Sequence, residues 1–121
     1  MAKNITPVFN RRRMAWDDKV IKSLKESDVE VIAYLPDSII ASLIQKAEDE
    51  DQFTSIRVAR EEEAIGVLGG AWLAGKRGAL ICQSSGLAIC FNALGSHAVP
   101  NYLSFVGLVT RRGDVGEHNW A

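Results

Sequence analysis

Residues Val58 to Leu94 read VAREEEAIGVLGGAWLAGKRGALICQSSGLAICFNAL, and this stretch decides the fold. A strand pattern ends just before three glutamates, Glu61–Glu63, and a helical pattern of small apolar residues follows. A second strand pattern ends at Gln83 and leads through Ser84-Ser85-Gly86 into another helical pattern. In an open parallel sheet, ligands bind outside the carboxyl ends of the strands. We therefore expect the functional site where these two strand-to-helix junctions meet.

Strands and helices alternate along the rest of the chain. Runs of apolar and β-branched residues predict strands at 29–35, 53–58, 78–83 and 102–110, and helical spacing predicts helices at 14–26, 39–47, 64–74 and 86–94. This alternation favours parallel βαβ units, so we predict an α/β fold with three layers, α/β/α, around a mainly parallel sheet. Residues 1–13 form a lead-in and residues 14–121 one domain. The last strand is followed only by a loop, so we expect that the fold is shortened at its C-terminus and the natural chain continues, or that a partner completes the sheet.

Composition excludes several classes of protein. A length of 121 residues, with 47% hydrophobic and 24% charged residues, is typical of one soluble domain. With a net charge of -1, the chain lacks the excess of positive charge that is typical of nucleic-acid-binding domains. The longest apolar stretch, Ala64–Ala74, is shorter than the roughly 20 residues that a membrane-spanning helix needs, and the N-terminus resembles no secretory signal. We therefore expect a cytoplasmic protein with no membrane or nucleic-acid partner.

Cysteine and histidine usage gives no metal site. Cys82 and Cys90 are wrongly spaced for a disulfide framework or a zinc site, so we expect two small buried side chains. His97, before Pro100, is expected to be structural. His118 lies in a terminal loop at the presumed ligand edge, so a functional role is an alternative to a structural one there. The chain contains no G-x-S-x-G nucleophile motif and no P-loop.

The two junctions each have two interpretations. Acidic side chains in the first turn of a helix interact favourably with its dipole, by about 0.3–1 kcal/mol each, and this alone would explain the glutamates. Alternatively Glu61, which lies nearest the strand end, shares a proton with a ligand nitrogen. Residues 83–86 are either a turn with Ser85 as N-cap or a segment that presents an amide and backbone N–H groups to a ligand. The predicted helix at 64–74 contains Gly66, Gly69 and Gly70. We expect these glycines to pack either on the sheet or across a subunit interface.

Three separated segments, in chain order, resemble the pyrimidine-binding domain of thiamine diphosphate-dependent decarboxylases. They are REEEAIGVLGGAWLAGK (60–76), QSSGLAICFNAL (83–94) and PNYLSFVGLVTRRGDVGE (100–117). The resemblance covers most of the chain from about Val29 and is closest to the sulfopyruvate and phosphonopyruvate decarboxylase group. It departs from that group at Ala88 and Ile89, where the group usually has Gly and Asn.

The resemblance implies roles for particular residues. Glu61 would be the catalytic glutamate that hydrogen-bonds the cofactor's aminopyrimidine ring, with Glu62 and Glu63 as competing assignments. The other cofactor-binding residues implied are Gln83, Ser85 and Gly86. The residues implied near the substrate are Ser38, Arg112 and His118.

The resemblance also implies a partner. The chain lacks the G-D-G motif with its following asparagine that holds Mg²⁺ and the diphosphate in this family, where that motif lies on a second domain. This implies an alpha subunit that forms a hetero-oligomer with a diphosphate-binding beta subunit and releases CO₂ and an aldehyde from a sulfopyruvate- or phosphonopyruvate-like 2-oxo acid. The alternatives are a non-catalytic α/β ligand-binding or regulatory module, and another carboligating member of the same superfamily.

Overall fold

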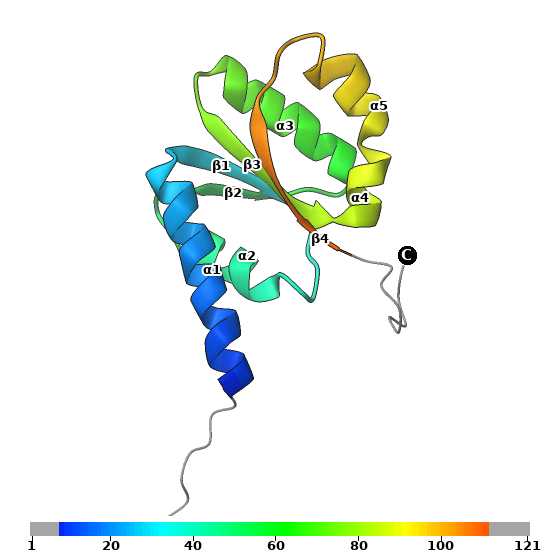
Figure 1. Cartoon of the computed structure of the whole chain (residues 1–121). Helices are drawn as coiled ribbons and strands as arrows, with labels where there is room; N and C mark the ends of the chain where they lie inside the picture. Colours follow the sequence, from blue (N-terminus) through cyan, green and yellow to red (C-terminus); the bar gives the residue numbers. More distant parts are fainter. Residues whose placement is uncertain (1–7, 112–121) are drawn as a thin grey trace, which may run out of the picture.

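The computed structural model describes residues 8–111, and their side chains from Trp16 onwards (Figure 1). The strands of its sheet are, in chain order, β1 (Val29–Tyr34), β2 (Thr54–Arg57), β3 (Arg77–Gln83) and β4 (Phe105–Thr110). The helical segments are α1 (Val8–Glu26), α2 (Ala41–Glu48), α3 (Glu61–Leu73), α4 (Ser84–Ile89), α5 (Phe91–Ala93) and the π-helix η1 (Leu94–Ala98).

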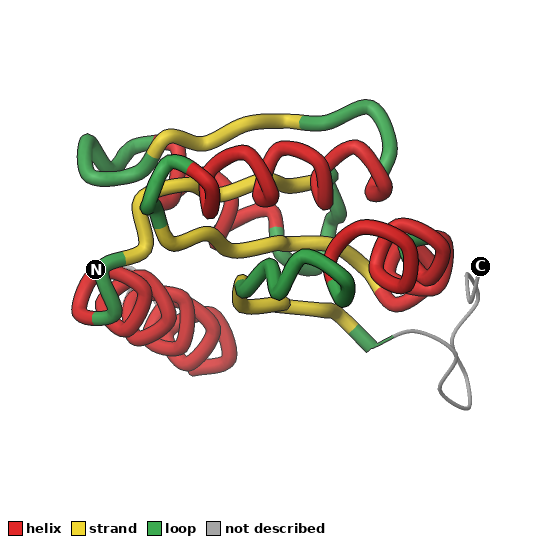
Figure 2. Tube along the Cα trace, turned by 90° about the horizontal axis from the view of Figure 1, so that it is seen from above, coloured by secondary structure: helices red, strands yellow, loops and turns green. Residues whose placement is uncertain are grey.

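The sheet is entirely parallel, with the strand order β2-β1-β3-β4. Helices α1 and α2 cover one face of the sheet, and α3 with the segment α4–η1 covers the other (Figures 1 and 2). The predicted three-layer α/β/α fold with a parallel sheet is confirmed.

The central strands are buried on both faces. In β1, Ile32 and Tyr34 pack into the layer formed by α1 and α2, whereas Val31 and Ala33 pack into the layer formed by α3. Successive side chains of a strand point to opposite faces, so a strand covered on both sides must be apolar throughout. This is why residues 31–34 of β1 and 78–82 of β3 are visible in the sequence as apolar runs.

Several element boundaries differ from the prediction. Helix α1 begins at Val8 rather than at residue 14, so part of the predicted lead-in is helical. Strand β4 begins at Phe105 rather than at Tyr102, because Tyr102 has a φ of 53°, a left-handed conformation that no strand contains. The helix predicted for 86–94 begins at Ser84 and is divided into α4, α5 and η1.

A buried carboxylate joins α1 to the start of α2. Asp17 is completely buried, and its Oδ2 accepts a short hydrogen bond from Ser42 Oγ. Its other oxygen, Oδ1, is buried and has no hydrogen-bond partner among the described residues. Since α2 has Ile40 as its N-cap and no side-chain cap, Asp17 supplies negative charge at the positive end of that helix.

We expect Ser42→Ala to lower the free energy of unfolding by about 1–3 kcal/mol, because it leaves both oxygens of a buried carboxylate unsatisfied. Urea denaturation of the isolated chain measures the effect. Ser23→Ala is the matched control, since it makes the same change on the exposed side of α1. An equal, small effect of both substitutions would contradict the prediction.

No helix within residues 8–111 combines the length and apolar character that crossing a membrane requires.

Candidate active site

The carboxyl ends of β1 and β3 form the topological switch point of the sheet. The two strands are neighbours, yet β1 continues into α2 on one face and β3 continues into α4 on the other. Open α/β sheets bind ligands in the crevice outside such strand ends. Helix α3 starts at the same edge because it follows β2. The two junctions singled out in the sequence therefore share one edge of the sheet.

The side chain of Glu61 lies directly against Gly86. Glu61 is the first residue of α3 and is only 7% exposed, although it carries a carboxyl group. A Cβ atom at Gly86 would lie 2.0 Å from Glu61 Oε1 and 2.4 Å from its carboxyl carbon. No side chain larger than hydrogen fits at residue 86 while Glu61 keeps this position. The glycine that the sequence assigned to cofactor binding thus has a packing role as well.

The three glutamates have three different environments. Glu62 forms an exposed ion pair with Arg60, with 2.9 Å between Oε2 and Nε. Glu63 Oε2 accepts a hydrogen bond of 2.8 Å from the backbone N–H of Ala59. Among the described residues, Glu61 has neither a hydrogen-bond partner nor an ion-pair partner. Two of the glutamates thus stabilise the start of α3, as the dipole interpretation expects, and Glu61 is the one left available for a ligand.

Residues 83–85 border the Glu61–Gly86 contact at the start of α4. Gln83 is the N-cap of α4 and makes no side-chain cap hydrogen bond, so the interpretation of Ser85 as the N-cap was wrong. Gln83 and Ser85 are half-buried, and their side chains make no hydrogen bond within residues 8–111. An amide and a hydroxyl therefore lie within three residues of Gly86 in the sequence, with no hydrogen-bond partner in the described part of the chain.

Two buried thiols lie beside the Glu61 carboxyl. Cys82 and Cys90 are both completely buried, as predicted, and Cys90 Sγ lies 3.4 Å from the backbone oxygen of Gly86. Burial is the main cause that raises the pKa of the Cys82 thiol to about 11, with smaller contributions from Cys90 and from the charge of Glu61. Burial and the charges of Glu61 and Glu62 also raise the pKa of Cys90. Both thiols are protonated and unreactive near neutral pH.

We expect the Cys82 thiol to make the fold less stable at alkaline pH. Between about pH 9, the ordinary pKa of a thiol, and about pH 11, the unfolded chain has lost this proton while the folded chain retains it. The unfolded state then binds fewer protons, so stability falls as pH rises, by about 1.4 kcal/mol per pH unit. Urea denaturation at pH 8, 9 and 10 measures the slope. A Cys82→Ala variant with the wild-type slope would contradict this.

Ser38, the predicted substrate residue within the described part of the chain, does not lie together with Glu61 and Gly86. Ser38 is exposed at the exit of β1 and lines a pocket of about 350 Å³ beside α2, whereas Glu61 lies on the face covered by α3. The neighbouring Asp37 accepts a hydrogen bond of 2.8 Å from Thr110 Oγ1, which ties the exits of β1 and β4 together. Arg112 and His118 lie outside the described residues.

The glycines of α3 divide into two groups. Gly69 is buried, and a Cβ there would lie 2.9 Å from both His97 Nε2 and Leu103 Cδ1. His97 therefore packs against α3, although the residue as a whole is exposed. Gly66 and Gly70 are exposed, and a Cβ at either would have no atom within 4 Å. Packing on the sheet does not explain these two glycines.

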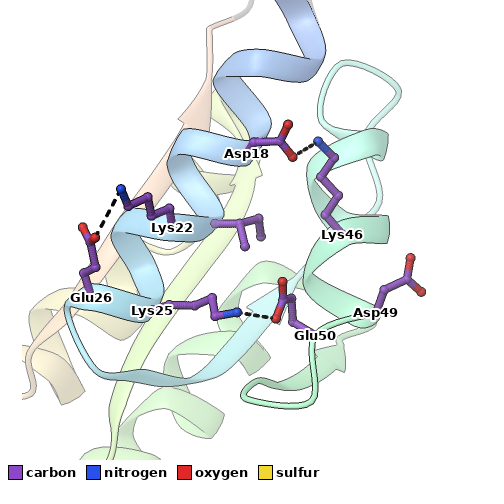
Figure 3. Close-up of a pocket in the computed structure, with 8 residues that line it drawn as sticks. Asp18, Lys22, Lys25, Glu26, Lys46, Asp49 and Glu50 are labelled. Carbon is purple, nitrogen blue, oxygen red and sulfur yellow. Dashed lines mark hydrogen bonds and ion pairs between the residues drawn. The ribbon is translucent and has the colours of Figure 1, made fainter.

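A charged pocket of about 490 Å³ lies away from this edge, between α1 and α2 (Figure 3). Its lysines and acids pair with one another: Lys46 with Asp18, Lys25 with Glu50 at 2.7 Å, and Lys22 with Glu26 at 3.6 Å. Exposed pairs of this kind contribute little energy and present little uncompensated charge to a ligand. Glu61 is buried and has no partner among residues 8–111, which makes the carboxyl edge the better candidate for chemistry.

Comparison with known proteins finds similar decarboxylases. The chain is 32% identical over 98 residues to the alpha subunit of sulfopyruvate decarboxylase from Methanocaldococcus jannaschii, and 33% identical over 100 residues to that from Methanococcus maripaludis. It is also 34% identical over 98 residues to phosphonopyruvate decarboxylase from Streptomyces viridochromogenes. These similarities support the assignment of the chain to this decarboxylase family. Each of these matches covers more than four fifths of the chain, which confirms the resemblance read from the three segments.

The decarboxylase relatives are longer than this chain. The matched part spans 58% and 60% of the two alpha subunits, and 25% of the phosphonopyruvate decarboxylase. No protein-family model matches the chain. Among solved structures, a 2-oxoglutarate:ferredoxin oxidoreductase from Magnetococcus marinus superposes with a TM-score of 0.68 at 20% identity, over 81% of this chain and 18% of that one. That superposition supports the fold alone.

Proposed function

We propose that this chain is the pyrimidine-binding alpha subunit of a thiamine diphosphate-dependent 2-oxo acid decarboxylase that acts on a sulfopyruvate- or phosphonopyruvate-like substrate. The observation that carries the proposal is Glu61, a buried carboxyl group with no partner among the described residues, at the switch point of the sheet. The names of the relatives supply the substrate class.

The residues around Glu61 suit an aminopyrimidine ring. Glu61 is 7% exposed and makes no side-chain hydrogen bond within residues 8–111, so its carboxyl group is free to bond a ligand. A ring nitrogen that shares a proton with the Glu61 carboxyl would satisfy it. Gln83 and Ser85 would supply further hydrogen bonds to the ring, with Gly86 keeping Glu61 in place. When bound, thiamine diphosphate supplies the carbanion stabilisation that loss of CO₂ from a 2-oxo acid requires.

The departures from the family pattern lie away from this contact. Ala88 and Ile89 are exposed on α4, whereas Glu61 and Gly86 are buried. A change at these exposed residues leaves the proposed cofactor contact intact, so it does not favour the alternative of a non-catalytic module. The change at Ala88 and Ile89 alters the exposed surface of α4, and so affects the contacts that a partner molecule would make there.

A beta subunit that holds the diphosphate and Mg²⁺ is part of the proposal. Three of the relatives are named alpha subunits, and the chain matches only a quarter of a longer protein named sulfopyruvate decarboxylase. The α3 layer also has the character of a contact surface: Gly66 and Gly70 leave the helix backbone open, and Leu73 and Phe91 are 82% and 71% exposed. We therefore propose a hetero-oligomer, located in the cytoplasm.

The substrate would lie between the two subunits. Ser38, Arg112 and His118 remain the proposed substrate contacts of this chain, from the resemblance. A sulfonate or phosphonate group needs cationic or N–H donors, which Arg112 and His118 are able to provide.

The direct test is calorimetric titration of thiamine diphosphate and Mg²⁺ into the chain alone and into a mixture with a candidate beta subunit. We expect tight binding, and CO₂ release from sulfopyruvate or phosphonopyruvate, in the mixture only. Analysis of the product separates an aldehyde, the expected result, from the product of a carboligating relative. Absence of cofactor binding with every beta subunit tried would contradict the proposal and support a non-catalytic module.

A further inference from the structure

We infer that Glu63 is a positioning residue: its carboxylate clamps the link between β2 and α3 and so holds Glu61 in the orientation that the cofactor needs. The inference rests on the proposed function and assigns a second of the three glutamates a defined part in it. Glu63 itself is exposed and does not contact the cofactor in this scheme.

The link is short and is held at both ends. At its start, the backbone N–H of Val58 donates to the carbonyl oxygen of Tyr34 at 3.0 Å, which fixes the chain to the sheet. At its end, Arg60 is the N-cap of α3, with an extended conformation and no side-chain cap hydrogen bond. Only Ala59 and Arg60 lie between Val58 and Glu61, so the direction in which Glu61 leaves the backbone depends on these two residues.

Glu63 binds this link from the helix side. Its Oε2 accepts the N–H of Ala59 at 2.8 Å, and its own backbone N–H donates to the carbonyl oxygen of Arg60 at 3.1 Å. This is the reciprocal arrangement of a capping box, displaced by one residue, and it replaces the side-chain cap that Arg60 does not provide. Glu63 therefore hydrogen-bonds both the N–H of Ala59 and the carbonyl oxygen of Arg60, the two groups that precede α3.

Within residues 8–111, no polar contact holds the Glu61 side chain. Its carboxyl group packs on Gly86 but has no hydrogen-bond or ion-pair partner in the described part of the chain, so its place follows from the backbone. A displacement of about 1 Å at a reacting group is able to lower a rate by roughly 100-fold. Loosening the Ala59–Glu63 clamp should therefore change catalysis by much more than it changes folding.

Three variants separate this role from a general effect of charge. Glu63→Ala removes the acceptor, Glu63→Gln keeps an acceptor oxygen without the charge, and Glu62→Ala removes the neighbouring exposed carboxylate as a matched control. In the complex with a beta subunit, we expect Glu63→Ala to lower kcat by about 10–100-fold with little change in KM, because the Ala59–Glu63 hydrogen bond orients Glu61 and does not bind substrate. Glu63→Gln and Glu62→Ala should stay within about threefold of wild type, since neither removes the clamp.

A second measurement does not depend on turnover. Hydrogen exchange of the Ala59 amide, followed by NMR in the isolated full chain, should become at least about tenfold faster in Glu63→Ala and stay near the wild-type rate in Glu63→Gln and Glu62→Ala, because only the first opens this hydrogen bond. Unchanged exchange in Glu63→Ala would overturn the inference, as would an equal decrease of kcat in Glu63→Ala and Glu63→Gln. If wild type shows no turnover with any beta subunit, the proposed function fails, whereas the exchange rates still decide whether the clamp exists.

Discussion

Replacing Glu61 with glutamine is expected to lower kcat of the complex with a beta subunit by about 10²–10⁴-fold, the usual contribution of general acid–base catalysis. Glutamine has the shape of glutamate and fits against Gly86, whose missing side chain leaves the space that Glu61 occupies. Its amide is able to hydrogen-bond a pyrimidine ring but cannot share a proton with it. The rate should therefore fall even where the cofactor still binds. Steady-state CO₂ release, together with calorimetric cofactor binding, measures both effects.

The same substitution should leave the fold intact or make it more stable. Burying a neutral amide requires less desolvation free energy than burying a carboxylate, and the substitution removes no hydrogen bond or ion pair of Glu61 within residues 8–111. Urea denaturation of the isolated chain tests this, with Glu62→Gln as the matched control on the exposed side of the same helical turn. Wild-type turnover in Glu61→Gln would remove Glu61 from the mechanism, and loss of folding would show that its role is structural.

Replacing Gly86 with alanine is expected to reduce turnover by a similar factor for a steric reason. The added Cβ would lie 2.0 Å from Glu61 Oε1, far inside van der Waals contact, so the carboxyl or the start of α4 has to move. Overpacking of this kind typically destabilises a fold by about 1–3 kcal/mol. Gly95→Ala is the matched control, because Gly95 is exposed and a Cβ there would have no atom within 4 Å.

The double variant tests whether Gly86 acts through Glu61. Substitutions that act through one interaction are not additive, whereas independent ones are. We expect Gly86→Ala to reduce kcat strongly in the wild-type background and only slightly in the Glu61→Gln background. Equal reductions in both backgrounds would mean that residue 86 contributes to cofactor binding by itself. Wild-type activity in the single Gly86→Ala variant would contradict the close contact between the two residues.

The layers and the parallel direction of the strands follow from features that are local in sequence. Each buried strand is a short apolar run, each surface helix has an apolar stripe, and alternation of the two leaves little choice but parallel βαβ units. Boundaries were predicted less well where the local signal is weak. Helix α2 begins after Ile40, which has no polar side chain to mark an N-cap, while Asp37 Oδ1 instead accepts the N–H of Ile39 at 3.4 Å in the turn before it.

The structure confirms that the two junctions meet at one edge of the sheet, whereas the functional roles of the residues there stay predictions. Two strand-to-helix junctions on one edge of a parallel sheet are evident from the sequence, and Glu61, Gln83, Ser85 and Gly86 were proposed from it. The thiols of Cys82 and Cys90 were expected to be buried, yet nothing in their spacing indicated that they lie beside the Glu61 carboxyl. The role of Glu63 was also missed, although its spacing from Ala59 is a signal that a search for helix caps could have found.

The amino-acid sequence by itself determined the α/β fold, the edge that carries the site and the resemblance to the decarboxylase family, because periodicity and short motifs are properties of neighbouring residues. Only the tertiary structure showed that Glu61 is buried while Glu62 and Glu63 make their own contacts at the start of α3. Three adjacent residues at the start of a helix have the same chemistry and the same local sequence, and successive side chains differ only in their direction around the helix axis. Which of them is buried depends on Gly86, which a different strand brings against α3, and this contact between distant segments exists only in the folded chain.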